Sequence, residues 1–198
     1  MLRLPADAGS IISVVGIDPG TTTLGTSVLW IDLNTMRIVS SFAKTFRGDR
    51  LQDGESWLGF LHGDRFSRIA AIECALLDLF QRVRPFMIVS EAPFISMRQP
   101  QAYGALTEVM CGIMNAMLAY DPWKPLYRVD PPTVKKKVGA PGNADKNAVK
   151  QALLRLPDLN YQGETPLAML DEHSVDALAV AYGKWRAYLE EMNYVVTV

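Results

Sequence analysis

The chain has 198 residues, of which 49% are hydrophobic, and its formal net charge at pH 7 is −1. This length and composition favour a globular fold with a sizeable core, and they exclude a low-complexity or strongly basic polypeptide. No apolar run approaches the roughly 18–20 residues of a membrane span, and the N-terminal residues lack the long apolar core of a signal peptide. We therefore expect one domain over residues 1–198, with its core at about 12–191, that works in the cytoplasm and contacts no membrane.

Three β-strands are expected first in the chain. Residues 12–17 are mostly β-branched and apolar, which is typical of a buried strand. Residues 24–33 alternate in part between apolar and polar side chains, and residues 36–46 resemble a third strand. The short links between them predict an antiparallel meander. Residues 47–63 are rich in Gly, Asp and Arg, and we expect them to form a long loop.

The rest of the chain alternates between predicted helices and strands. Apolar residues recur at helical spacing over residues 65–83, and a short buried strand that ends at Glu91 follows. The later elements are a helix at about 101–119, a strand at 125–130, a lysine-rich turn, and helices near 144–155 and 172–191. The order β-β-β-α-β-α-β-α-α predicts an α/β fold. Its mixed sheet would have five strands, the first three antiparallel, with helices on both faces.

Cysteine usage and local charge bear on the environment and the partners. Cys74 and Cys111 lie in apolar stretches with helical character, and their spacing fits neither a disulfide framework nor a zinc site. We therefore predict two buried, reduced thiols. Residues 134–150 carry five lysines against one aspartate. This local basic patch suits DNA although the total charge is near neutral.

Acidic side chains stand at the ends of two predicted strands, at Asp18 and Glu91. Strand ends on the same side of an α/β sheet are where sites are assembled. His173 and Asp176 are three residues apart, so they share one face of the last helix near its N-terminus. Such a group repels itself unless cations lie between its members, and oxygen ligands favour Mg²⁺ or Mn²⁺. Two such ions could activate a water molecule for phosphodiester hydrolysis.

Each of these residues also has a simpler structural interpretation. Asp18, followed by Pro and Gly, fits a turn, and Glu91 fits an exposed charge at a strand end. Asp171 and Glu172 fit charges at a helix N-terminus, and His173 alone fits a helix cap or a surface side chain. Only the joint pattern favours a metal site.

Four stretches together resemble the RuvC family of Holliday-junction resolvases, within the RNase H-like nuclease superfamily, over about residues 12–188. The stretch "GIDPGTTTLG" is similar to the first family motif, "IVSEAPF" to the second, "PPTVKKKVGAPGNADK" to the lysine segment, and "HSVDALAVA" to the last motif. The resemblance implies a homodimeric, metal-dependent endonuclease that makes paired symmetric nicks in four-way DNA junctions. It also implies two Mg²⁺ ions per active site, with Mn²⁺ as the alternative.

The resemblance gives roles to the residues that match those motifs. The implied catalytic and metal-binding residues are Asp18, Glu91, His173 and Asp176. The expected DNA contacts are Phe94, Lys135 and Lys146 from the resemblance, with Lys136 and Lys150 added as further phosphate contacts. Phe94 could stack against an unpaired base, or it could be an ordinary core side chain. The small-residue helix at 101–119 is a candidate dimer face, with a simple core helix as the alternative.

The sequence departs from the family pattern in three places. Many family members have aspartate where His173 stands, although some have histidine, and imidazole suits Mn²⁺ better than Mg²⁺. His173 would therefore bind metal directly or accept a proton near the attacking water. Pro141 alters the glycine pattern of the lysine segment, and the total charge is less basic than expected. These departures suit a divergent, phage-type member, active in the cytoplasm of a bacterium or of a phage-infected host cell.

Three other functions share part of this pattern. The first phosphate loop of sugar kinases and heat-shock ATPases also reads like "GIDPGTTTLG", but those proteins need a second domain and a second glycine-rich motif, which this sequence lacks. A junction-binding scaffold without catalysis would keep a clustered acidic set that destabilises it. A related RNase H-fold nuclease that acts on RNA or on other branched DNA remains open.

Overall fold

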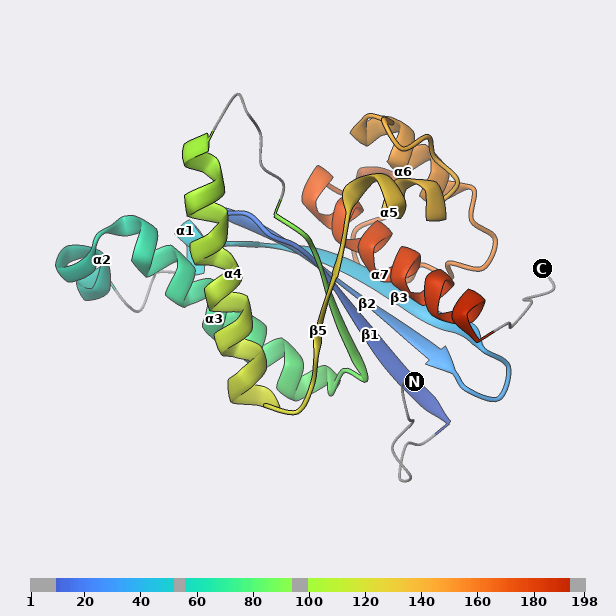
Figure 1. Cartoon of the computed structure of the whole chain (residues 1–198), viewed down its shortest axis with the longest axis horizontal. Helices are drawn as coiled ribbons and strands as arrows, with labels where there is room; N and C mark the ends of the chain where they lie inside the picture. Colours follow the sequence, from blue (N-terminus) through green and yellow to red (C-terminus); the bar gives the residue numbers. More distant parts are fainter. Residues whose placement is uncertain (1–9, 52–55, 94–99, 193–198) are drawn as a thin grey trace.

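The computed structural model describes residues 10–51, 56–93 and 100–192. They form an α/β structure whose single sheet lies between two helical layers (Figure 1). The strands are β1 (Ile11–Asp18), β2 (Thr23–Asp32), β3 (Arg37–Arg47), β4 (Met87–Glu91) and β5 (Leu126–Val129). The helices are α1 (Gly48–Leu51), α2 (Ser56–His62), α3 (Asp64–Val83), α4 (Pro100–Tyr120), α5 (Pro131–Lys137), α6 (Lys146–Leu154), the 3-10 helix η2 (Leu167–Met169) and α7 (Glu172–Glu191). No helix in this part of the chain is both long enough and apolar enough to span a membrane.

The sheet is mixed and has five strands in the order β3-β2-β1-β4-β5. β1 pairs antiparallel with β2, and β2 pairs antiparallel with β3, so the predicted meander is confirmed. β4 joins the other edge of β1 in parallel, and β5 follows in parallel. The strand order places β1 in the centre of the sheet, with the carboxyl end of β4 beside its own.

Helices cover both faces of the sheet, as the sequence predicts (Figure 1). On one face, α3 and α4 pack against each other and bury residues that include Ile72, Phe80 and Ile113. On the other face, α7 crosses β1 and β2, and α5 and α6 lie against it. The predicted apolar stripe of α7 is buried in this second core, at Val175, Leu178, Ala179, Tyr182, Trp185 and Leu189.

Two segments differ from the sequence-based expectation. The sequence predicts a loop over 47–63, but α1 and α2 lie there. Apart from Gly59, the residues of α2 have no strong helix-breaking character, so the polar, glycine-rich flanks do not prevent a short helix. Its apolar side chains at Trp57, Phe60 and Leu61 stay exposed. The lysine-rich turn is a helix, α5. Asp130 caps it by accepting a 3.0 Å hydrogen bond from the backbone N–H of Thr133, with proline in its first turn.

Both cysteine side chains are exposed, so the prediction of buried thiols is wrong, although no disulfide joins them. The buried residues of α3 include Ile72, Leu76 and Phe80, which are spaced by one helical turn. Cys74 lies two positions from Ile72 and Leu76 and therefore points away from their side. Cys111 similarly lies on the solvent side of α4. The apolar character of both helices is correct, but it does not fix which side chains face inward.

Candidate active site

Asp18 and Glu91 end neighbouring parallel strands. The last residue pair in the parallel register of β1 and β4 is Ile17 with Ser90, and the next residue of each strand is the acidic one. Sheet register alone therefore brings both carboxylates to the same end of the sheet, where the sequence predicts them. Neither residue is fully exposed, because both lie where α7 covers the sheet.

Two glycines let α7 approach this end of the sheet. A Cβ atom at Gly25 would lie 2.0 Å from the carbonyl oxygen of His173 and 3.2 Å from the Cβ of Asp18. A Cβ atom at Gly16 would lie 2.4 Å from the carbonyl oxygen of Ala177. Only glycine permits such close backbone contacts. Because Gly25 pairs with Asp18 across β1 and β2, the start of α7 arrives directly beside the first aspartate.

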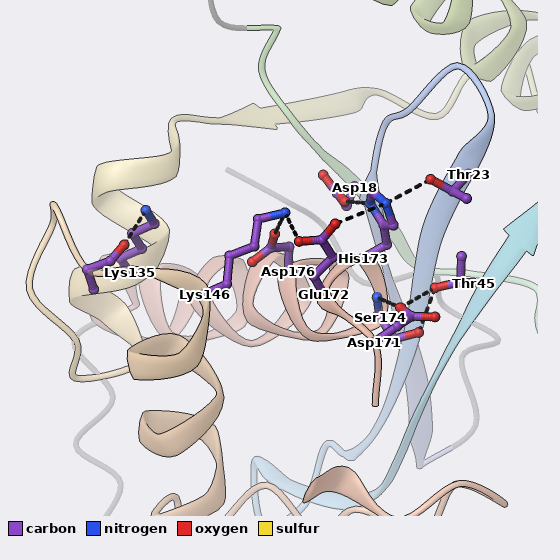
Figure 2. A network of polar contacts seen from close by, with 11 residues as sticks. Asp18, Thr23, Thr45, Lys135, Lys146, Asp171, Glu172, His173, Ser174 and Asp176 are labelled. Atoms are coloured by element: carbon purple, nitrogen blue, oxygen red, sulfur yellow. Dashed lines mark hydrogen bonds and ion pairs between the residues drawn. The ribbon is translucent and has the colours of Figure 1, made fainter. Parts of the chain in front are cut away.

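Asp171 fixes where α7 begins. Its carboxylate accepts a 2.8 Å hydrogen bond from the backbone N–H of Ser174 and a 2.5 Å hydrogen bond from the hydroxyl of Thr45 on β3. The interpretation of Asp171 as a residue of the helix N-terminus is therefore confirmed. With the helix start tied to the sheet in this way, His173 and Asp176 occupy its first turns beside Asp18 (Figure 2).

His173 bridges the first aspartate and β2. Its Nδ1 lies 2.8 Å from Oδ2 of Asp18, and its Nε2 lies 2.8 Å from Oγ1 of Thr23 (Figure 2). The hydrogen bond with Asp18 raises the pKa of His173, and partial burial of the ring opposes this rise. Because both ring nitrogens are engaged, the imidazole must release Asp18 or Thr23 before it can bind a metal ion directly.

Glu91 and Asp176 are carboxyl groups whose charged forms are disfavoured. Burial, followed by the charges of Asp18 and Asp176, raises the pKa of Glu91 to about 7. Burial and the charge of Asp18 raise the pKa of Asp176 to about 6. Lys135 and Lys146 act on both groups in the opposite direction. No hydrogen bond or ion pair joins the Glu91 carboxylate to another described residue, so added positive charge would stabilise it.

Lys146 is the lysine that reaches the acidic residues. Its Nζ lies 2.5 Å from Oε2 of Glu172 and 3.9 Å from Oδ2 of Asp176 (Figure 2). Burial lowers the pKa of Lys146, but the hydrogen bond to Glu172 and the charge of Asp176 outweigh this effect and raise it. The first residue of α6 and the first residue of α7 are thereby joined next to the site.

The other predicted DNA-contacting lysines are placed differently. Lys135 donates a 2.7 Å hydrogen bond to the carbonyl of Ala144, within the lysine segment. Lys150 donates a 2.6 Å hydrogen bond to the carbonyl of Leu170, just before α7. Lys136 is exposed. The sequence predicts one basic surface. In the structure, Lys135 and Lys150 instead donate hydrogen bonds to main-chain carbonyls, and Lys136 is open to solvent.

Two of the residues that complete this arrangement are not predicted by the sequence pattern. Thr23 holds the second nitrogen of His173, and Glu172 holds Lys146. Thr23 lies within the first motif, but a threonine in a strand start carries no signal for a histidine 150 positions away. Phe94, predicted at the DNA, lies outside the described residues.

The chemistry of the carboxylates fits a divalent cation. Asp18, Glu91 and Asp176 offer the oxygen ligands that Mg²⁺ and Mn²⁺ prefer, and positive charge would lower the raised pKa values of Glu91 and Asp176. Within residues 10–51, 56–93 and 100–192, no group of three or more His, Cys, Asp or Glu side chains is already arranged to hold a metal ion.

Comparisons with known proteins bear on the fold. No protein-family model matches the sequence, and no curated protein sequence matches it. Among solved structures, the chain is similar to Thermus thermophilus RuvC, with a TM-score of 0.61 and 22% identity over 92% of this chain and 97% of that one. T. thermophilus RuvC in complex with a Holliday junction substrate gives a TM-score of 0.59 and 21% identity, over 91% and 96% of the two chains.

A mitochondrial protein from yeast has the same architecture. The Holliday junction resolvase Ydc2 matches with a TM-score of 0.56 and 16% identity, over 90% of this chain and 82% of that one. These identities are low, so the likeness is one of fold. Together with the mixed sheet and the helices on both faces, it shows that the chain has the same fold as T. thermophilus RuvC.

Proposed function

We propose that the protein is a metal-dependent, structure-selective endonuclease that cleaves four-way DNA junctions. The observation that carries the proposal is that Asp18, Glu91 and Asp176 lie near enough for the charges of the two aspartates to act on Glu91. They do so where α7 covers the ends of β1 and β4. The RuvC-like fold supports a nuclease, and the structure of T. thermophilus RuvC with a Holliday junction substrate supports branched DNA as the partner.

The proposed chemistry divides the work among four side chains. Asp18, Glu91 and Asp176 would hold the cations through their carboxylate oxygens. When bound, two Mg²⁺ or Mn²⁺ ions supply an activated water and neutralise charge on the scissile phosphate. His173 keeps Asp18 oriented through Nδ1, and its Nε2 can leave Thr23 to bind metal or to accept a proton.

DNA contacts would come from the lysines beside this acidic group. Lys136 is exposed and Lys146 lies at the edge of the acidic residues, so both can reach a phosphate by side-chain rotation alone. Lys135 and Lys150 would first have to give up their backbone carbonyl partners. Phe94 stays a proposed wedge or stacking residue at the crossover.

Exposed apolar side chains on α4 favour a homodimer as the working unit. Tyr103, Met114 and Leu118 are exposed, and together with Cys111 they follow one side of the helix. Two copies related by a two-fold axis would mirror the symmetry of a four-way junction and permit paired nicks. Leu118→Glu should convert the dimer to a monomer in sedimentation measurements, with Glu164→Gln as an unaffected control.

The direct test is a cleavage assay on purified protein. It would compare a four-way junction, a three-way junction, a flap, an RNA–DNA hybrid and a linear duplex, each with Mg²⁺ or Mn²⁺. We expect the four-way junction to be cut preferentially, with a second, symmetric nick. Preferential cutting of the hybrid or the flap would instead assign the protein to a related RNase H-fold nuclease.

The same assay tests the site. Glu91→Gln should bind the four-way junction as the unchanged protein does and lose metal-dependent cleavage. Glu164→Gln, which changes an exposed glutamate between α6 and η2, is the matched control and should cleave normally. Normal cleavage by Glu91→Gln would overturn the assignment.

A further inference from the structure

Glu172 has no role in the proposed chemistry, yet it makes the closest contact with Lys146. The two side chains are both about half exposed, at 52% and 56%, and an ion pair at that exposure contributes little to stability. Its placement is more informative than its strength. The pair holds the ammonium group of Lys146 at the edge of the candidate metal site, 3.9 Å from Oδ2 of Asp176 (Figure 2).

The charges around Lys146 explain why it stays there. Besides Glu172, the negative charges of Asp176 and Asp18 act on it. Lys146 in turn acts on the carboxyl groups of Glu91 and Asp176. One ammonium group therefore supplies positive charge to the same carboxylates that the proposed function gives to divalent cations.

We propose that Glu172 is a positioning residue that holds Lys146 against Asp176, so that Lys146 and a divalent cation compete for the same carboxylate. A cation bound at Asp176 would repel the ammonium group and would take its place as the positive charge beside the carboxylate. Lys146 then turns outward and becomes available to a DNA phosphate. Metal binding and DNA binding thereby favour each other through one side chain, as linkage requires of any such coupling. This inference rests on the proposed metal site and on Lys146 as a DNA contact.

The position of Lys146 makes this movement short. Lys146 begins α6, and its side chain is more than half exposed. Besides Asp176, its partner is Glu172, which is an exposed side chain rather than a backbone group. Lys135 and Lys150 differ in this respect, because each donates to a main-chain carbonyl. Among these lysines, Lys146 is the one whose ion-pair partner belongs to the candidate metal site.

The first experiment measures metal binding without DNA. Mn²⁺ would be titrated into the full chain, with free Mn²⁺ followed by electron paramagnetic resonance. Lys146→Gln should bind Mn²⁺ about threefold to tenfold more tightly than the unchanged protein, because a competing positive charge is gone. The control Lys136→Gln should leave the affinity unchanged. Equal Mn²⁺ affinity of Lys146→Gln and the unchanged protein would overturn the proposal that Lys146 competes with the metal ion for Asp176.

The second experiment measures the salt dependence of four-way junction binding, in EDTA and in Ca²⁺. In Ca²⁺, Lys146→Gln should lower the slope of log K against log salt by about one, the effect of one lost phosphate contact. In EDTA it should leave the slope unchanged, because Glu172 and Asp176 already hold the ammonium group. Glu172→Gln should raise the slope in EDTA toward its value in Ca²⁺, since Lys146 is released without metal.

Lys136→Gln is the matched control, and it should lower the slope equally in both conditions. If Lys146→Gln also lowers the slope equally in both, Lys146 is a constant DNA contact and the inference fails. If it lowers the slope in neither, Lys146 does not reach phosphate and the inference fails too. Failure of the proposed function looks different, because then the unchanged protein binds no Mn²⁺ or shows no preference for the junction over a linear duplex.

Discussion

The acidic residues and the lysines of the candidate site are held in place in different ways. We call Asp18, Glu91, His173 and Asp176 the acidic floor, and Lys135, Lys136, Lys146 and Lys150 the lysine rim. The floor side chains come from paired strands and from a helix that touches two glycines, so backbone register and close packing fix them. The rim side chains stand on the short helices α5 and α6 and reach their partners through long, flexible stems. Changes in and beneath the floor should therefore have the larger effects on stability and chemistry, whereas changes at exposed rim residues should mainly alter DNA binding.

The largest loss of stability is expected at Gly25, because the close approach of α7 to the floor requires a residue without a side chain. In Gly25→Ala, the new Cβ would lie 2.0 Å from the carbonyl oxygen of His173, which is backbone and cannot rotate away. We expect a loss of about 3 kcal/mol in the free energy of unfolding, measured by urea denaturation, together with loss of cleavage. Gly104→Ala on α4 is the control, because nothing lies within 4 Å of its added Cβ. It should change stability by less than about 1 kcal/mol, in the stabilising direction. Equal stabilities of the two variants would mean that α7 does not rest on Gly25.

The next effect concerns the charge of Glu91. Its pKa is raised from 4.5 to about 7 in the folded protein, so the folded chain binds more protons than the unfolded chain between these values. Stability should therefore fall as pH rises from about 4.5 to 7, by roughly 3 kcal/mol at 1.36 kcal/mol per pKa unit. Glu91→Gln removes this loss and should be the more stable protein at pH 8 in EDTA, by about 3 kcal/mol, with little difference at pH 4.5.

Thermal denaturation in EDTA at several pH values measures this difference, and added Mg²⁺ at pH 8 should narrow it by stabilising only the unchanged protein. Asp176 shares the direction of the shift, with a pKa of about 6, so some pH dependence will persist in Glu91→Gln. Parallel pH profiles of the two proteins would show that Glu91 ionises as readily as a surface glutamate.

The floor could be predicted from the sequence to the extent that it depends on strand order. Asp18 and Glu91 each end an apolar run, and once these runs are parallel neighbours, the two carboxylates must lie side by side. The contact between Thr23 and His173 could not be predicted in this way. It depends on how closely α7 approaches β2, which is set by Gly25 and by no pattern along the helix.

The rim was less accessible to prediction for a physical reason. A cluster of lysines indicates positive charge, but a lysine stem is long enough to reach a carbonyl, a carboxylate or solvent. Which of these partners the ammonium group reaches depends on the capped starts of α5 and α6, and the sequence pattern predicts a turn in place of α5. Lys150 on Leu170 and Lys146 on Glu172 are therefore observations that only the fold supplies.

A smaller effect is expected from His173→Asp. The substitution gives a fourth carboxylate ligand and removes the hydrogen bond to Thr23, and carboxylate suits Mg²⁺ better than imidazole does. Cleavage should survive, with the ratio of the rate in Mn²⁺ to the rate in Mg²⁺ lowered several-fold relative to the unchanged protein. Paired rate measurements in the two metals give this ratio. An unchanged ratio would mean that His173 only orients Asp18 and does not bind metal during the reaction.

The smallest effects should separate two lysines that the sequence treats alike. Lys136 is exposed, so Lys136→Gln should leave stability within about 0.5 kcal/mol and lower the salt slope of junction binding by about one. Lys150 instead donates to the carbonyl of Leu170, immediately before the cap of α7. Lys150→Gln should therefore lower stability by about 1 kcal/mol and leave the salt slope nearly unchanged. If Lys150→Gln lowers the slope as much as Lys136→Gln does, Lys150 leaves its carbonyl partner to bind DNA, and the rim moves further on binding than its contacts imply.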